Sequence, residues 1–328
     1  MRGMRWFTGV AMAACLCGVA PSQTINREDT ALQAKLAEIA AAHHGKVALY
    51  AVNLETHKTV GLHADEEVQT ASVIKLAILF EAMEQVRAGK AHWDEKITLP
   101  AGYAVGGSGV LTFLDAPLML TLKDVLTMMI VMSDNTATDL AIDRLGIDNI
   151  NGRIAWMGLE HTHLYKRISK PATGPMPPDQ PKFGLGKTTP REMALLMQHI
   201  QQCDLALPAE RVTDADAARD KAICAVGMKM LQKQFYRDTI PRYLEKMDSS
   251  ETGSAIASKT GSLNAVRADV AIVAGKGGPM VLSIFTYENA DQSWTADNEG
   301  EVTIAKLAKA IVETWSPAGI DGKTLGWY

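Results

Sequence analysis

The alternation of hydrophobic and polar positions predicts strands at both ends of the chain and helices between them. Runs rich in β-branched and apolar residues, bounded by turn residues, predict strands at 46–53, 58–62, 255–260, 268–274 and 280–287. Helical periodicity predicts helices at 29–44, 72–88, 121–131, 136–144, 190–202, 216–233 and 301–315. Strands from the two ends therefore form one mainly antiparallel sheet with flanking helices, into which an all-α lobe is inserted.

This pattern indicates an α/β protein with a single domain over residues 23–328. We place its α/β lobe at about 23–66 and 210–328, and its helical lobe at about 67–209. A cleft where two lobes meet is a usual place for a site. Residues 165–189 are rich in proline and glycine and show no periodicity, so they predict a long functional loop.

The first residues have the order of a secretory signal. Arg2 and Arg5 precede an apolar stretch over residues 6–20, and small residues before Gln23 allow cleavage after residue 22. A lipid anchor at Cys15 is the weaker alternative. No later stretch is long and apolar enough to span a membrane. We therefore expect an exported protein, periplasmic or secreted, with no membrane span after signal cleavage.

Composition and charge limit the classes of molecule that the protein is expected to bind. A chain with 47% hydrophobic and 21% charged residues is an ordinary globular protein. A net charge of −4 and the lack of a long basic run argue against nucleic acid as a partner. Cys203 and Cys224 have no metal-ligand spacing, and the pair either forms a disulfide or remains as two buried thiols. We expect a monomer that acts on a small-molecule substrate without a metal or cofactor.

The first chemical motif is Ser72-Val73-Ile74-Lys75 at the start of a predicted buried helix. Residues three apart on a helix share a face, so Lys75 can serve as the base that a serine nucleophile needs. Lysine is a base only when its pKa is depressed by burial or by a second cation. The apolar neighbours of Lys75 offer the burial, and Lys259 offers the cation. A helix cap followed by a surface lysine is the alternative.

The second motif is Ser133-Asp134-Asn135, between two predicted helices. Ser133 can relay a proton to a leaving nitrogen, and Asn135 can donate a hydrogen bond to a substrate amide carbonyl. Asp134 can hold the turn through backbone hydrogen bonds. Taken alone, the same three residues are also typical of a helix N-cap.

The third motif is Lys259-Thr260-Gly261-Ser262, which ends a predicted strand. Lys259, Thr260 and Ser262 can bind a substrate carboxylate, and Arg267 on the next strand can add charge to that site. Gly261 would let an extended substrate approach the strand backbone closely. A solvent-facing strand end is the alternative for this motif.

The three motifs together supply a nucleophile, its proton acceptors and an anion clamp. The backbone N–H groups of Ser72 and Ser262 would complete an oxyanion hole. In this order, the motifs resemble those of class A β-lactamases over nearly the whole mature chain. The matching segments are Ala71-Ser72-Val73-Ile74-Lys75, Met132-Ser133-Asp134-Asn135-Thr136-Ala137, Lys259-Thr260-Gly261-Ser262, Thr188-Thr189-Pro190 and Arg267-Ala268-Asp269-Val270. The resemblance implies the two-lobed fold and an acyl-enzyme route.

The chain departs from this family in the Ω-loop. The family carries a Glu-x-x-x-Asn there, and its glutamate activates the deacylating water. No glutamate occurs here between His161 and Pro190, and the one acid in that stretch is Asp179. Asp179 is a candidate substitute base, although its side chain is shorter. Losing a general base typically costs about 10²–10⁴-fold in rate, so the departure affects deacylation.

These observations predict an exported serine hydrolase that forms an acyl-enzyme on Ser72. Ser72 is the nucleophile, Lys75 the base and Ser133 the proton relay. β-Lactam hydrolysis with slow deacylation is the leading interpretation. A D,D-peptidase-like or esterase activity uses the same acylation machinery and does not need the loop glutamate. The third hypothesis is a protein that acylates and stalls, as a β-lactam trap or sensor.

Overall fold

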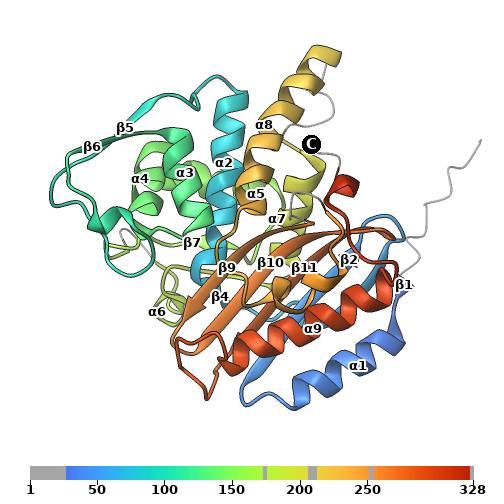
Figure 1. Ribbon diagram of the computed structural model, residues 1–328. Coiled ribbons are helices and arrows are strands. Elements are labelled where there is room, and N and C mark those ends of the chain that lie inside the picture. Colours follow the sequence, from blue (N-terminus) through green and yellow to red (C-terminus); the bar gives the residue numbers. More distant parts are fainter. Residues whose placement is uncertain (1–26, 173–175, 206–212, 251–254, 326–328) are drawn as a thin grey trace, which may run out of the picture.

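The computed structural model describes residues 27–172, 176–205, 213–250 and 255–325 (Figure 1). The predicted signal segment 1–22, with Cys15, lies outside these ranges. Within them, no helix has both the length and the apolar character that a membrane crossing requires.

A six-stranded sheet confirms the prediction that strands from both chain ends come together. Its order is β1-β3-β2-β11-β10-β9, and every neighbouring pair is antiparallel except β1 and β3. The strands are β1 (Arg27–Glu28), β2 (Lys46–Asn53), β3 (Lys58–Leu62), β9 (Ile256–Leu263), β10 (Val266–Gly275) and β11 (Gly278–Tyr287). All of β10 is buried, as expected for a central strand covered on both faces.

Helices cover both faces of this sheet. Two of them, α1 (Thr30–Ala41) and α9 (Glu299–Trp315), lie side by side on one face (Figure 1). On the other face, α7 (Pro190–Gln202) packs on β2, β10 and β11, while α8 (Asp214–Gln232) packs on β9. These positions agree with the sequence-based prediction of flanking helices, although α7 lies within the range 67–209 that we assigned to the helical lobe.

The helical lobe is built around α2 (Lys75–Arg87), which follows a 3-10 helix over Ala71–Ile74. Ten of its thirteen residues are buried, as its all-round apolar pattern predicts. Around it pack α3 (Leu122–Val131), α4 (Asn135–Leu145), α5 (Ile147–Trp156) and α8. The lobe begins with Ala71–Ile74, so the predicted nucleophile lies where the two lobes join.

Several short elements were not predicted. The hairpin β5 (Lys96–Leu99) and β6 (Leu118–Thr121) extends from the helical lobe (Figure 1). A three-stranded sheet has the order β4-β8-β7, formed by β4 (Val68–Gln69), β7 (His163–Leu164) and β8 (Gly186–Thr188). The predicted loop 165–189 therefore contains β8 and one helical turn, α6 (Gln180–Phe183). Further 3-10 helices are Leu111–Phe113, Ile240–Tyr243, Glu245–Met247 and Gly322–Leu325.

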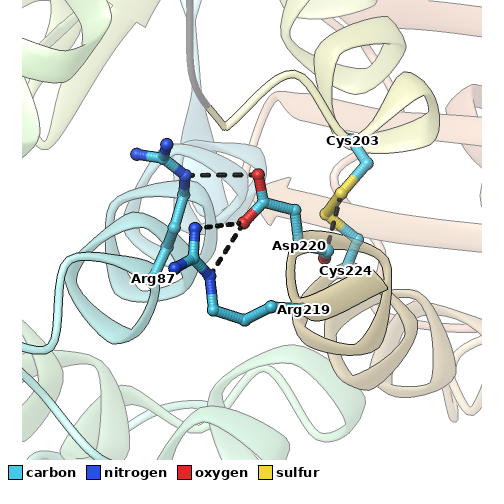
Figure 2. The surroundings of a disulfide bond; sticks show 5 residues. All are labelled: Arg87, Cys203, Arg219, Asp220 and Cys224. Atoms are coloured by element: carbon cyan, nitrogen blue, oxygen red, sulfur yellow. Dashed lines mark hydrogen bonds and ion pairs between the residues drawn. A yellow bond between two sulfur atoms is a disulfide. The ribbon is translucent and has the colours of Figure 1, made fainter. Parts of the chain in front are cut away.

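A disulfide joins Cys203 to Cys224 and settles the choice between a bond and two thiols (Figure 2). It connects the residue that ends α7 to the middle of α8. Beside it, the buried carboxylate of Asp220 accepts hydrogen bonds from Arg87 of α2 and from Arg219. The bond and this ion-pair cluster hold three helices of the core together.

Candidate active site

The three sequence motifs meet at one cleft, where the helical lobe faces the edge strand β9. The cleft has a volume of about 1030 Å³. Ser72, Ser133, Asn135, Thr260, Gly261 and Ser262 line it. Lys75, Lys259 and Arg267 lie behind this lining, with exposures of 0%. The structure therefore brings together residues that lie up to nearly two hundred positions apart in the chain.

Ser72 is half-buried in the 3-10 helix, and Lys75 is the first residue of α2. The Lys75 Nζ lies 2.8 Å from the backbone oxygen of Ser133, 3.2 Å from Ser133 Oγ and 3.2 Å from Asn135 Oδ1. In the described part of the chain, the hydrogen bonds of this side-chain amine run to the second motif, while the backbone N–H of Lys75 donates to the backbone oxygen of Ser72. Burial and then the charge of Lys259 hold the pKa of Lys75 well below its ordinary value. A lysine in this state can accept a proton.

Ser133 lies between the two buried lysines. Its Oγ is 3.2 Å from Lys75 Nζ and 3.0 Å from Lys259 Nζ. The residue has a φ of +52°, a left-handed conformation that is uncommon for residues other than glycine. Backbone strain of this kind is found mainly at functional sites, where the surrounding structure holds the residue in position. The geometry suits a hydroxyl that passes protons between one amine and a leaving group.

Lys259 also donates to the backbone oxygen of Thr260 at 2.7 Å. Burial lowers its pKa to about 7, opposed by the negative charge of Asp269. Asp269 is itself fully buried, which raises its pKa to about 6. It accepts hydrogen bonds from the Thr239 hydroxyl at 2.6 Å and the Ile240 N–H at 3.2 Å. The cation behind Ser133 is therefore balanced by a carboxylate in β10.

The second motif is held by its own side chains. Asp134 caps α4 by accepting from the Ala137 N–H at 2.9 Å, and its other oxygen accepts from the N–H groups of Val110 and Leu111. The Asn135 amide donates to the backbone oxygen of Gly106 at 2.9 Å. The predicted turn role of Asp134 is thus observed. The glycine-rich segment 106–109 is therefore hydrogen-bonded to the motif and lines the cleft.

The end of β9 runs close to the nucleophile. A Cβ placed on Gly261 would lie 3.0 Å from the backbone nitrogen of Ser72 and 3.1 Å from the backbone oxygen of Thr70. A side chain at this position would therefore push the strand away from the 3-10 helix. Glycine lets the backbones of Ser72 and Ser262 lie at the same end of the cleft, as an oxyanion hole requires.

Arg267 does not line the cleft. Its guanidinium donates to Glu301 at 3.0 Å and to the backbone oxygens of Val266, Leu263 and Ser293. The ring of Trp294 covers it, with the centroid 4.8 Å from the guanidinium carbon. The guanidinium of Arg267 is therefore fully buried behind the strand, and its role at a substrate carboxylate stays a prediction.

The loop after β7 presents Lys166 and Ile168 to the cleft. The buried Asp139 of α4 accepts hydrogen bonds from the Ile168 N–H at 2.7 Å and from the N–H and hydroxyl of Ser169. Asp179 is not among the residues that line the cleft; its carboxylate is 3.9 Å from the Lys187 Nζ. No acid of this loop therefore faces the described part of the cleft.

Sequence reasoning did not single out several residues of this site, among them Asp139, Ile168, Tyr236 and Trp294. The last three line the cleft, and Asp139 fixes one of its walls. Asp139 lies four residues after Asn135, on the helix that follows the second motif. That spacing was the one available signal for it, since residues four apart share a helix face.

Comparison with solved structures identifies the architecture. A β-lactamase from Sphaerobacter thermophilus is 28% identical, with a TM-score of 0.71, and the match covers 87% of this chain and 97% of that one. PBP-A is 24% identical, with coverages of 89% and 98% and a TM-score of 0.69. A variant of the last common ancestor of Gram-negative bacteria class A β-lactamases is 21% identical, with coverages of 87% and 97% and a TM-score of 0.70. A comparison with curated proteins finds no match.

The fold is therefore that of the class A β-lactamases, as the sequence motifs predict. A family model described as the β-lactamase enzyme family matches residues 31–315, which is most of the chain. The protein belongs to this β-lactamase enzyme family.

Proposed function

We propose that the protein is a serine hydrolase that forms an acyl-enzyme on Ser72, with β-lactams as substrates. The observation that carries this proposal is the position of Ser133 Oγ between two buried lysine amines, 3.2 Å from Lys75 and 3.0 Å from Lys259. A hydroxyl held between two amines of lowered pKa can move a proton in either direction. Family membership and the Sphaerobacter thermophilus β-lactamase support the substrate class.

In the proposed acylation, Ser72 Oγ bonds to the carbonyl carbon and the carbon–nitrogen bond of the substrate breaks. The proton of Ser72 goes to neutral Lys75. Ser133 gives its proton to the leaving nitrogen and takes one from protonated Lys75, whose Nζ is 3.2 Å from Ser133 Oγ. The backbone N–H groups of Ser72 and Ser262 bind the oxyanion. Asn135 is proposed to donate a hydrogen bond to the substrate amide carbonyl. Protons and charge balance without any further reactant.

The substrate carboxylate is proposed to bind at the end of β9, through Thr260 and Ser262. Lys259 lies behind these residues and supplies the positive charge. We assign Arg267 to this anion site in the role of a positioning residue. Its guanidinium donates hydrogen bonds to backbone oxygens on either side of the β9–β10 turn. Gly261 allows the close approach of substrate and strand.

Deacylation is proposed to be slow. The side chains that the loop after β7 gives to the cleft include Lys166 and Ile168, neither of which is a carboxylate. Asp179, the one acid of residues 165–189, is paired with Lys187 instead. The same observation favours the second candidate, a D,D-peptidase-like or esterase activity, since that chemistry does not need a loop glutamate. A protein that acylates and stalls would act as a trap or sensor.

The experiment is to mix the purified protein with benzylpenicillin and follow its intact mass. We expect an increase by one whole ligand that persists, and that is absent in Ser72→Ala. Ser108→Ala is the matched control, because Ser108 also lines the cleft but belongs to no motif. A rapid loss of penicillin without an adduct would instead show full turnover. An adduct that survives Ser72→Ala would refute the proposal.

The signal segment supports export of the mature chain from residue 23, to the periplasm or outside the cell. We propose that the mature protein acts as a monomer. The mass of the secreted protein tests the cleavage point, and lipid attachment at Cys15 would show as a larger mass.

A further inference from the structure

Trp294 is the most exposed aromatic side chain of the cleft, with an exposure of 67%. One face of its ring is covered by the Arg267 guanidinium, at 4.8 Å from the ring centroid. Exposed tryptophan costs hydrophobic free energy, because a large apolar surface stays in water. A ring held with one face covered and the rest open to a cleft is suited to contact with a ligand.

The ring is also held in place. Arg267 donates to the backbone oxygen of Ser293, the residue before Trp294, and its Nε is 3.0 Å from Glu301. Glu301 lies in the first turn of α9 and also lines the cleft. The same buried guanidinium therefore supports both the indole ring and the backbone that carries it. A preorganised ring loses little conformational entropy when a ligand stacks on it.

Strand pairing places Trp294 at one end of the cleft. Arg267 is the direct partner of Ser262 in the β9–β10 ladder, so the ring above Arg267 lies beside the proposed carboxylate site. Ile168 and Phe183 line the cleft from a different segment, the loop between β7 and β8. In a penicillin, the carboxylate is on the ring that carries the leaving nitrogen. A substrate whose carboxylate binds at the end of β9 would therefore have its leaving group, and not its acyl group, beside Trp294.

We propose that Trp294 determines specificity for the leaving group, and that it favours carboxylate-bearing leaving groups with a flat, aromatic body. This inference rests on the proposed acylation of Ser72. The carboxylate would bind at Thr260 and Ser262, while the aromatic body stacks on the open part of the indole. Tyr236 is a second exposed aromatic residue that lines the cleft.

The test uses two esters of phenylacetylglycine, one with 3-hydroxybenzoate and one with glycolate as the leaving group. Both give the same acyl-enzyme on Ser72, so differences in kcat/KM come from acylation. In each case, the ester C–O bond breaks and the leaving oxygen takes a proton through Ser133. Trp294→Ala should lower kcat/KM for the benzoate ester about fivefold, and for the glycolate ester by less than about twofold. Trp294→Phe should recover most of the loss.

Phe113→Ala is the control, because Phe113 is an exposed aromatic residue that does not line the cleft. It should leave both esters unchanged. An equal fall for the two esters in Trp294→Ala would overturn the inference and show that the ring only supports Arg267. No change for either ester would overturn it as well. Failure of the wild-type protein to acylate with both esters and with benzylpenicillin would reject the proposed function itself.

Discussion

The carboxylate of Asp139 accepts the backbone N–H of Ile168 at 2.7 Å, and this bond fixes one wall of the cleft. Asp139 is fully buried in α4, and its second oxygen accepts from the Ser169 N–H at 3.0 Å. An ionised carboxylate only accepts hydrogen bonds, so it matches two successive N–H donors. The pairing turns the loop so that the apolar side chain of Ile168 lines the cleft.

Replacement of Asp139 by asparagine should weaken this attachment. The amide of asparagine keeps one acceptor but places an NH₂ group against a donor, which leaves a buried N–H without a partner. We expect a loss of about 1–3 kcal/mol in the free energy of unfolding. Amide exchange at Ile168 and Ser169 should accelerate. Asp148→Asn is the control, because Asp148 is an exposed residue at the start of the next helix, α5. Unchanged stability and exchange in Asp139→Asn would contradict this account.

A carboxylate at position 168 should supply the missing base for deacylation. Ile168→Glu places an acid in the cleft from the same loop in which the related enzymes carry theirs. General base catalysis typically contributes about 10²–10⁴-fold, so we expect the acyl-enzyme to decay at least about 100 times faster. The decay of the benzylpenicillin adduct by intact mass measures this rate.

Ile168→Gln is the matched control for this change, because glutamine has the same size and polarity but cannot take up a proton near neutral pH. Its adduct should persist as in the wild type. If the Glu and Gln variants lose their adducts at the same rate, then polarity or loop disturbance causes the effect, and the idea of a missing base is wrong.

Acylation should depend on pH through Lys259. Burial lowers its pKa to about 7, so the amine loses its proton as the pH rises through that value. The anion site then loses its charge, and the second-order acylation rate with benzylpenicillin should fall above about pH 7. Lys259→Arg keeps its charge at every accessible pH, so its profile should stay flat in this range. A wild-type profile that stays flat up to about pH 9 would disprove the assignment to Lys259.

The same pKa shift makes stability depend on pH in a defined direction. Between about pH 7 and the unfolded value of 10.5, the unfolded chain binds more protons at Lys259 than the native chain does. The free energy of unfolding should therefore rise with pH between about pH 7 and 10.5 because of Lys259, and this gain should be lost again as the pH falls back to about 7. Lys259→Met should remove this component from unfolding free energies measured at several pH values. Asp269 titrates lower, with a pKa of about 6.

The sequence was sufficient to predict five of the six strands of the main sheet, most helices and the three motifs, because each rests on a local pattern. It missed α5, where Asn149, Asn151 and Gly152 are poor helix formers. Burial of Ile150 and Ile154 against the lobe overrides that propensity. The stack of Trp294 on Arg267 and the bond of Asp139 to the loop join residues far apart in the chain. Such contacts depend on tertiary placement, which no local pattern carries.

The disulfide should stabilise the protein without taking part in the chemistry. Cys203 and Cys224 are 21 residues apart, and closing a loop of that size is worth about 3 kcal/mol by restriction of the unfolded chain. Neither cysteine lines the cleft. The double variant Cys203→Ala and Cys224→Ala should therefore lose about 3 kcal/mol in urea unfolding and still acylate at the wild-type rate.

Reductant provides the internal control for this prediction. It should lower the stability of the wild type to that of the double variant, and it should leave the double variant unchanged. Asp220 would still join α8 to α2 through Arg87, so unfolding should remain a single cooperative transition (Figure 2). A double variant that is as stable as the wild type would show that residual structure in the unfolded chain cancels the effect of the bond. Slower acylation would instead show that the contact between α7 and α8 positions Ser72, because both helices also pack against α2.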